Sequence, residues 1–275
     1  MKEKVKTPVI TVLKGLWVGG TMTVPGVSGG SMAMILGIYD KLIFALNTLF
    51  HSWKSVWFLA CFLGGSVTGM FLFSQLVLNL LTRWPMPVKY FFLGAVAGGI
   101  PMIYRAANGE KERGPVWQSV LWVVLGIVLV FLISLIPEGL FTPGSATGLG
   151  GIALQLAGGV IVAIALVLPG ISVSQMLLML GLYEDLIAAL GRFDILPYLP
   201  LIVGCVGGIF LSARVLAGAL RHHPRAAYLT VLGFLLGSLP DLAPGLPTGW
   251  TAAVCVLTAT AGFSAVYAVS RATRN

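Results

Sequence analysis

Charged residues are scarce in this sequence, at 9% of 275 residues, whereas a soluble globular domain carries about 25%. A water-facing surface has to be covered with polar groups, so the deficit excludes a soluble enzyme, a disordered chain and a coiled coil. Apolar residues make up 57% of the chain, and the mean hydropathy is +0.96. The apolar stretches are long and continuous, without the period-two alternation of an outer-membrane barrel. The remaining class is an all-α polytopic membrane protein.

Cysteine is also rare. The three cysteines, Cys61, Cys205 and Cys255, all lie in apolar stretches, and no metal-ligand spacing accompanies them. We therefore predict no disulfide framework, no metal site and no cofactor. The net charge of +8 suggests membrane topology here, with no nucleic-acid partner. The basic start, Met1 to Lys6, lacks a clean cleavage site after its apolar run, so we interpret it as a retained cytoplasmic N-terminus.

Residues 25–46 recur 144 positions later, as residues 169–190. Within this window 11 of 22 positions are identical, where the composition would give roughly two by chance. Such a duplication is typical of secondary transporters, although a duplicated structural bundle is the alternative. The looser matches are Cys61 and Gly64 against Cys205 and Gly208 and, after a small indel, Gly94-x-x-x-Gly98-x-x-Pro101 against Gly233-x-x-x-Gly237-x-x-Pro240.

Each half contains one interrupted apolar segment followed by three continuous ones. We predict a single transmembrane domain over residues 1–275, in which repeat one covers about 9–136, an outer loop 137–151 and repeat two about 152–270. The apolar segments are 9–50, 55–81, 88–107 and 116–136 in the first half, and 152–191, 197–219, 226–242 and 250–270 in the second.

The interrupted segment decides the expected topology. Its arms, 9–24 and 28–39, would form helices of about 24 and 18 Å, shorter than the roughly 30 Å hydrocarbon core. A re-entrant helical hairpin therefore fits better than two crossings, and Pro25 and Gly26 suit its turn. Three further crossings in each half would make the two repeats inverted relative to each other, with both termini cytoplasmic.

The distribution of basic residues agrees with this topology, since cytoplasmic loops of membrane proteins carry an excess of Lys and Arg. The long outer segments 137–151 and 241–249 contain neither residue. The outer loops would carry only Arg83, Lys89 and Arg192. The inner loops would carry Lys2, Lys4, Lys6, Lys54, Arg105, Lys111, Arg113, Arg221, Arg225, Arg271 and Arg274.

The two hairpin turns are the candidate substrate site. We call residues 25–31 the first tip and residues 169–175 the second tip. Each precedes a new half-helix, which places unpaired N–H groups, hydroxyls and the positive end of a helix dipole at the turn, an arrangement that binds anions such as phosphate. The alternative is a Pro-Gly kink capped by its serines. The candidate residues are Pro25, Gly26, Ser28, Gly29, Gly30, Ser31, Pro169, Gly170, Ser172, Ser174 and Gln175.

Ionisable residues refine the class. Near mid-membrane the sequence places no acid and no nucleophile–base grouping, so an enzyme is not expected. Lys14 and Arg214 would snorkel towards the inner surface. Asp40, Glu184 and Asp185 are interfacial anchors or candidates for proton or sodium coupling. The candidates for headgroup capture, with ordinary interfacial anchoring as the alternative, are Arg83, Lys89, Arg214, Arg221, His222 and Arg225.

The first tip and the residues that follow it, Pro25-Gly-Val-Ser-Gly-Gly-Ser-Met-Ala-Met-Ile-Leu-Gly-Ile-Tyr-Asp-Lys-Leu-Ile43, carry a family resemblance. Together with the second copy and the overall length, they resemble the bacterial PopT family, long catalogued as a domain of unknown function. The resemblance implies translocation of undecaprenyl phosphate, the C55 lipid carrier, from the outer to the inner leaflet for reuse in cell-envelope synthesis. The second tip departs from the first, reading Ser-Val-Ser-Gln for Ser-Gly-Gly-Ser, so the two tips would bind phosphate unequally.

We therefore predict a non-enzymatic lipid-phosphate translocase of the bacterial cytoplasmic membrane, with undecaprenyl phosphate and membrane lipid as its partners. Its oligomeric state is not predicted. The Gly94/Gly98 and Gly233/Gly237 pairs would allow close helix packing. The alternatives are an ion-coupled transporter of a small organic anion and a polyprenyl-diphosphate phosphatase.

Overall fold

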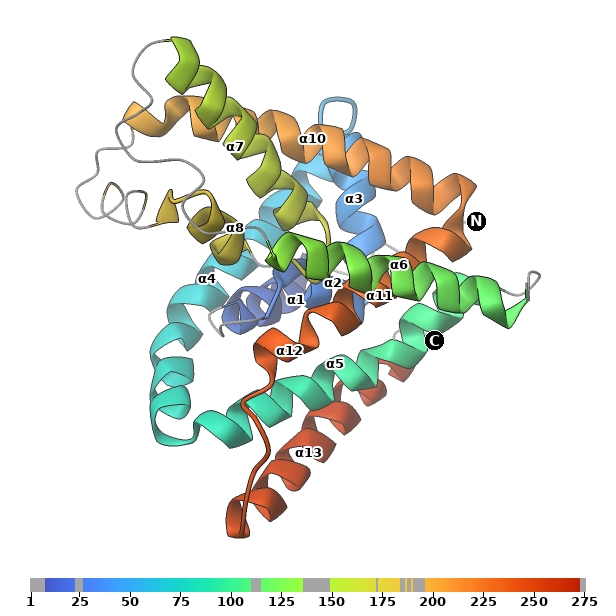
Figure 1. The fold of residues 1–275 in the computed structure, drawn as a ribbon. Helices are drawn as coiled ribbons and strands as arrows, with labels where there is room; N and C mark the ends of the chain where they lie inside the picture. The colour runs from blue at the N-terminus through green and yellow to red at the C-terminus, as the bar shows by residue number, and fades with distance from the viewer. Residues whose placement is uncertain are drawn as a thin grey trace.

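A computed structural model describes residues 8–22, 27–109, 115–135, 149–171, 173–183, 186, 189 and 196–272, without the side chains of residues 149, 174, 175 and 269–272. Every regular element in this part of the chain is helical, which confirms the all-α class (Figure 1). The elements are α1 (Pro8–Thr21), α2 (Gly29–Ile35), α3 (Tyr39–Asn47), α4 (Trp53–Arg83), α5 (Pro85–Asn108), α6 (Val116–Ser134), α7 (Leu149–Val167), α8 (Val173–Met179), the 3₁₀ helix η1 (Leu196–Tyr198), α10 (Leu199–His222), α11 (Pro224–Gly237), α12 (Leu239–Leu242) and α13 (Trp250–Ala272).

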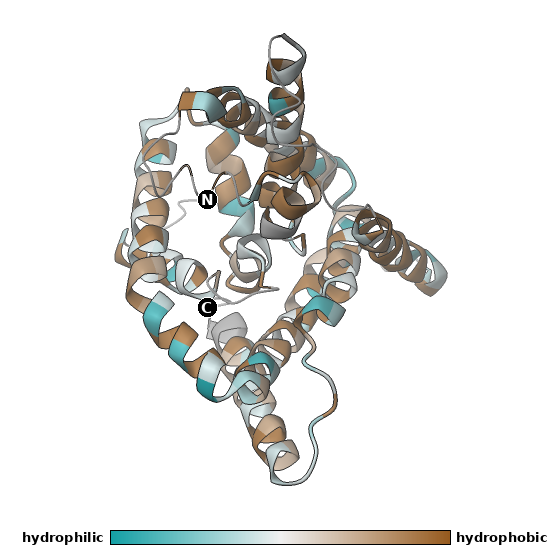
Figure 2. Ribbon diagram, turned by 60° about the vertical axis from the view of Figure 1, so that its left-hand side comes forward, coloured by the Kyte–Doolittle hydropathy of each residue, from teal (hydrophilic) through white to brown (hydrophobic). Residues whose placement is uncertain are grey.

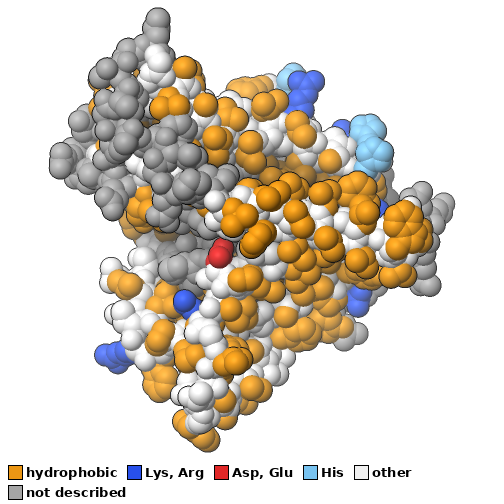
Figure 3. Space-filling view, in the orientation of Figure 1, with side chains coloured by type: hydrophobic (Ala, Val, Ile, Leu, Met, Phe, Trp, Pro, Cys, Tyr) orange, Lys and Arg blue, Asp and Glu red, His pale blue; other side chains and the backbone are white. Residues whose placement is uncertain are grey.

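Among the described residues, six helices are long and apolar enough to cross a membrane, and the bent pair α2–α3 would make a seventh if it is one span. The hydropathy colouring of Figure 2 is brown along most of these helices, and Figure 3 shows hydrophobic side chains over most of the visible described surface. These features indicate a multi-pass membrane protein. The six spans are Trp53–Arg83, Pro85–Asn108, Val116–Ser134, Gly150–Val167, Leu196–His222 and Trp250–Ala268.

Two helices depart from the expected segments. The predicted crossing 226–242 is wrong as a continuous helix, because α11 ends at Gly237 and α12 begins at Leu239. The residue after Leu239 is Pro240, which fits the first turn of a new helix but not the interior of a long one.

The first helices of the two halves differ in length. Helix α7 covers about 28 Å and is long enough to span the membrane alone, whereas α1 covers about 21 Å.

The helix expected over 28–39 ends earlier, at Ile35, and α3 turns away from α2 by 114°. Gly37 causes this break, since its φ is +63° and it closes a Schellman motif in which the N–H of Ile38 donates to the carbonyl of Ala33. The same motif recurs 144 positions later, at Gly181, where φ is +69° and the N–H of Leu182 donates to the carbonyl of Leu177. Glycine is needed at both turns because other residues rarely adopt positive φ.

Helix α2 lies at the centre of the molecule. It contacts α1, α3, α5 and α7, and Figure 1 shows α1 and α2 near the middle, with longer helices around them. Met32 and Ile35 are each only 1% exposed, and both belong to the main buried cluster with Leu229 and Leu235 of α11. The seven residues of α2 are therefore held in place by packing, because an isolated helix of this length is too short to be stable on its own.

The repeated glycine pairs in α5 and α11 make close helix contacts, as expected, but with partners from the other half of the chain. A Cβ on Gly94 would lie 1.9 Å from the carbonyl oxygen of Ala259 in α13. A Cβ on Gly233 would lie 2.2 Å from the carbonyl oxygen of Val123 in α6. The last helix of each half thus packs on the Gly-x-x-x-Gly helix of the opposite half.

A second kind of helix pair joins neighbours within each half. Gly15 of α1 packs on the carbonyl of Phe62 in α4, and Gly159 of α7 packs on the carbonyl of Leu201 in α10. These contacts relate α1 to α7 by 144 residues but α4 to α10 by 139. The expected equivalence of Cys61 with Cys205 is therefore wrong: close backbone contact decides the register, and it makes Ser66 the counterpart of Cys205.

Candidate functional site

The first tip is described from Val27 onwards, so Pro25 and Gly26 lie outside the described residues. Ser28 stands at the N-cap of α2 with an extended backbone, and its side chain makes no capping hydrogen bond. The interpretation that this serine merely caps the helix is therefore wrong. Because α2 has only seven residues, its dipole is weak, and an anion here would depend on hydroxyl and backbone N–H donors.

The second tip is described at Pro169, Gly170 and Ile171. Ser172 lies outside the described residues, and Ser174 and Gln175 lie in α8, where their side chains are not described. Gly170 has a φ of +92°, and a Cβ there would lie 2.6 Å from the carbonyl carbon of Phe234. Backbone conformation and close packing on α11 both require glycine at this position.

The fold brings the two tips together. A Cβ on Gly30 would lie 3.0 Å from the Cα of Pro169, so the first tip packs directly on the second. Gly29 packs on the sulfur of Met22, at 2.6 Å from its own hypothetical Cβ. Sequence reasoning expected these glycines to admit a ligand to the backbone, whereas the structure gives both a packing role. Ser31, next along α2, is buried at 3% exposure.

Tyr39 makes a hydrogen bond between the two halves that the sequence did not indicate. Its hydroxyl, in the first turn of α3, donates to the carbonyl of Val167 at 2.5 Å, and the bond is buried. Val167 ends α7, so this bond satisfies one of the carbonyls that a helix end leaves unpaired. It also joins the first half of the chain to the end of α7, directly before the second tip. The sequence did contain one relevant signal: Tyr39 recurs in the repeat as Tyr183.

Of the coupling candidates, only Asp40 belongs to the described residues. Asp40 is exposed at the start of α3, and its Oδ2 accepts a hydrogen bond of 2.7 Å from the hydroxyl of Tyr228 in α11. Glu184 and Asp185 lie outside the described side chains. Tyr228 was also missed by the sequence reasoning, since it lies in the other half of the chain and matches Lys89, not tyrosine, in the repeat at an offset of 139.

The candidates for headgroup capture lie on four different helices. Arg83 ends α4 and is exposed, whereas Lys89 of α5 is half-buried. Arg214, Arg221 and His222 are exposed on α10, and His222 pairs through Nδ1 with the carbonyl oxygen of Gly218 at 2.9 Å.

Arg225 has a structural contact with α6. Its guanidinium donates to the hydroxyl of Ser119 at 2.7 Å and to the carbonyl of Pro115 at 3.1 Å. These bonds hold the start of α11 against the start of α6, which gives Arg225 a structural role.

Lys14 differs from its expected behaviour. Its ammonium does not extend along the helix to the membrane surface, because Nζ donates to the carbonyl of Leu36 at 2.5 Å. Leu36 is the C-cap of α2, where a cation is favoured by the negative end of the helix. The snorkelling interpretation of Lys14 is therefore wrong, and the side chain points into the protein.

The sequence comparisons give related proteins with a common description. Residues 18–254 match the model of the VCA0040-like family, described as undecaprenyl phosphate translocase-like. The chain is 29% identical to a polyprenyl-phosphate transporter of Vibrio cholerae, over 89% of this chain and 80% of that protein. It is 30% identical to a polyprenyl-phosphate transporter of Staphylococcus aureus, over 87% of each chain. No solved structure matches this chain significantly.

Proposed function

Because the chain belongs to the undecaprenyl phosphate translocase-like family, we propose that it carries undecaprenyl phosphate across the bacterial cytoplasmic membrane. The direction we propose is from the outer to the inner leaflet, which returns the carrier for reuse in cell-envelope synthesis. The names of the two relatives, both polyprenyl-phosphate transporters, support the substrate class. The proposed activity moves the lipid without making or breaking a covalent bond.

The recurrence of helix contacts supports two inverted repeats. The α5–α13 pair and the α11–α6 pair use equivalent glycines, since Gly262 packs on the carbonyl of Phe91 and Gly126 on that of Thr230. Each pair combines one helix from each half. We propose that the two halves have opposite orientations in the membrane, with both termini cytoplasmic, and that α1–α2 forms a re-entrant hairpin. The equivalent pair α7–α8 would return the chain to its starting side in the same way, although α7 is long enough to span.

The headgroup site we propose is the junction of the two tips. The observation that carries it is the contact between Gly30 and Pro169, which joins two equivalent turns from opposite halves. The hydroxyl of Ser28, which is not used for capping, would donate to the phosphate there. The polyprenyl tail would stay in the lipid, against the apolar outer faces of the helices. Asp40, held by Tyr228, is the proposed coupling residue for a proton or sodium ion.

A proteoliposome assay that follows undecaprenyl phosphate between leaflets tests this function. The wild-type protein should accelerate its movement, and Ser28→Ala with Ser172→Ala should slow it roughly tenfold or more, since a hydrogen bond to a charged group contributes about 1.5–3 kcal/mol. Ser134→Ala, on the exposed end of α6, is the matched control and should transport normally.

Three results would overturn parts of this proposal. Unaltered transport by the double serine variant would exclude the tips as the headgroup site. Competition by water-soluble organic anions would favour a small-anion transporter. Release of inorganic phosphate from undecaprenyl diphosphate by the purified protein would establish a phosphatase.

A further inference from the structure

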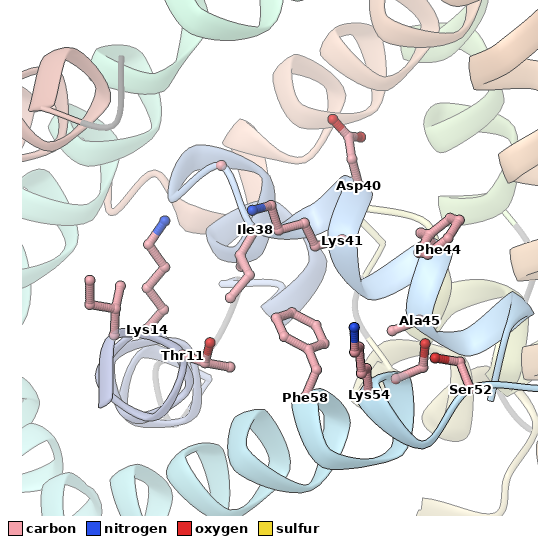
Figure 4. A pocket seen from close by; sticks show the side chains of 13 residues that line it. Thr11, Lys14, Ile38, Asp40, Lys41, Phe44, Ala45, Ser52, Lys54 and Phe58 are labelled. Atoms are coloured by element: carbon pink, nitrogen blue, oxygen red, sulfur yellow. The ribbon is translucent and has the colours of Figure 1, made fainter. Parts of the chain in front are cut away.

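An open cavity of about 660 Å³ lies at the C-terminal end of α2, lined by α1, the α2–α3 turn, α3 and the start of α4 (Figure 4). Its volume is within the range of small-molecule sites. Three lysines line it, each from a different helix: Lys14 of α1, Lys41 of α3 and Lys54 of α4. We call it the lysine cavity. Lysines from three separate elements along one lining give it a positive potential, which favours an anionic ligand.

The remaining polar groups of the lysine cavity suit the same ligand. Thr11 and Ser55 are buried at 8% and 6% exposure, and both line it. Asp40 is the one carboxylate among the described residues of the lining, and it is hydrogen-bonded to Tyr228. In Figure 4 the Asp40 carboxylate extends away from the lysines. The lining carries three ammonium groups, each with three N–H donors, and Lys14 uses one of its donors on the carbonyl of Leu36.

Helix α2 connects this cavity with the proposed headgroup site. The N-cap of α2 is Ser28 in the first tip, and its C-cap is Leu36, whose carbonyl accepts the bond from Lys14. Seven helical residues span about 10 Å. A phosphate leaving the tip would therefore meet the lysine cavity one short helix away, next to the N-terminal ends of α3 and α4.

The apolar part of the lining indicates a lipid. Ile10 and Phe44 line the lysine cavity and are 39% and 52% exposed, and Val9 and Leu13 beside them on α1 are 62% and 57% exposed. A free phosphate needs no apolar surface at its site. A phosphate attached to a polyprenyl chain would place its charge among the lysines and its first isoprene units on these side chains.

Two of the three lysines have no basic counterpart in the second repeat. At an offset of 144, Lys14 is matched by Gly158 and Lys41 by Asp185. The second repeat retains the tip, the turn glycine and the packing glycines but not these two lysines. The two repeats therefore differ in charge at the end where the lysine cavity lies. By the distribution of basic residues, Lys54 would lie at the cytoplasmic end.

We propose that the lysine cavity binds the phosphate of a polyprenyl phosphomonoester on the cytoplasmic side of the tips. It would serve as an intermediate binding site during translocation of the lipid. The inference rests on the proposed function for its substrate class. It adds a second phosphate site that is distinct from the tips and uses two lysines, Lys14 and Lys41, that the second repeat does not retain.

The test uses the full chain in detergent micelles, with a photoreactive farnesyl phosphate as probe. Labelled peptides should include those from α1, α3 and α4. Lys41→Gln with Lys54→Gln should lower this labelling and weaken farnesyl phosphate binding roughly tenfold or more. Both lysines are exposed, so the double variant should fold. Arg105→Gln, an exposed arginine outside the cavity, is the matched control and should behave as wild type.

The outcomes separate this inference from the proposed function. Unchanged labelling of α1, α3 and α4 in the double lysine variant would overturn the inference, even if the wild type transports. Lysine-dependent labelling by a protein that does not transport in proteoliposomes would support the cavity and overturn the function. Competition by inorganic phosphate as strong as that by farnesyl phosphate would overturn the lipid as ligand, as would equal competition by farnesol, which lacks the phosphate.

Discussion

Three of the long-range hydrogen bonds in the described part of the chain join α3 to the second half. Tyr39 donates to the carbonyl of Val167, Tyr228 donates to Asp40, and Asn47 donates to the carbonyl of Ala213 at 3.0 Å. All three involve the turn and helix that follow the first tip. Polar contacts of this kind fix position in an apolar protein, because packing of similar aliphatic side chains tolerates many arrangements.

The Asp40–Tyr228 bond can be tested by a double-mutant cycle. Asp40→Asn and Tyr228→Phe should each lower stability, and the double variant should lose less than the sum, with a coupling of about 1 kcal/mol because Asp40 is exposed to solvent screening. Thermal unfolding in detergent measures the stability. Tyr104→Phe, an exposed tyrosine of α5, is the control and should change little. Strictly additive losses would show that the bond does not form in the membrane protein.

At the scale of helices, the molecule is organised by glycine contacts between pairs. Packing in a membrane depends on close backbone approach, since lipid removes the advantage of simply burying apolar groups. The α1–α4 and α7–α10 pairs lie within a half, whereas α5–α13 and α6–α11 combine helices from both. Neither half therefore forms its complete helix packing alone.

Gly94→Ala tests these inter-half contacts. A methyl group would lie 1.9 Å from the carbonyl oxygen of Ala259, which is backbone and has no side-chain freedom to move away. We expect a loss of about 1–3 kcal/mol, seen as a lower unfolding temperature in detergent.

Gly64→Ala is the matched control in α4, because a Cβ there would meet nothing within 4 Å. Replacing an open helical glycine with alanine should be neutral or stabilise by about 0.5–1 kcal/mol. Equal destabilisation by the two variants would mean that α5 and α13 do not pack as described.

At the scale of the whole molecule, orientation is the property to measure. In a background with Cys61, Cys205 and Cys255 replaced by serine, single cysteines report the side through labelling with a membrane-impermeant maleimide. Lys54→Cys and Arg105→Cys should label only in inverted vesicles, and Arg83→Cys should label in intact cells, because basic loops stay in the cytoplasm. Lys54 and Arg83 lie at opposite ends of α4, so labelling of Lys54→Cys and Arg83→Cys from the same side would contradict the proposed topology.

Much of the helical framework follows from composition along the chain. The segments 55–81, 88–107, 197–219 and 250–270 and residues 116–134 of the segment 116–136 lie on helices long and apolar enough to span, because runs of this kind have one stable backbone state in lipid. Gly37 and Gly181 were visible as a repeat but not as turns. The break between Gly237 and Leu239 was missed because the sequence stays apolar through it.

The sequence by itself determined the solvent, the duplication and the two Pro-Gly tips, since hydropathy and residue identity are local properties. Only the tertiary structure decided which helices pair across the halves, that Gly30 meets Pro169, and that Lys14 turns inward to the end of α2. The same scarcity of charge explains the difference. With so few polar groups, nothing in the linear pattern specifies a partner, so close backbone contacts and a few long-range hydrogen bonds select the arrangement.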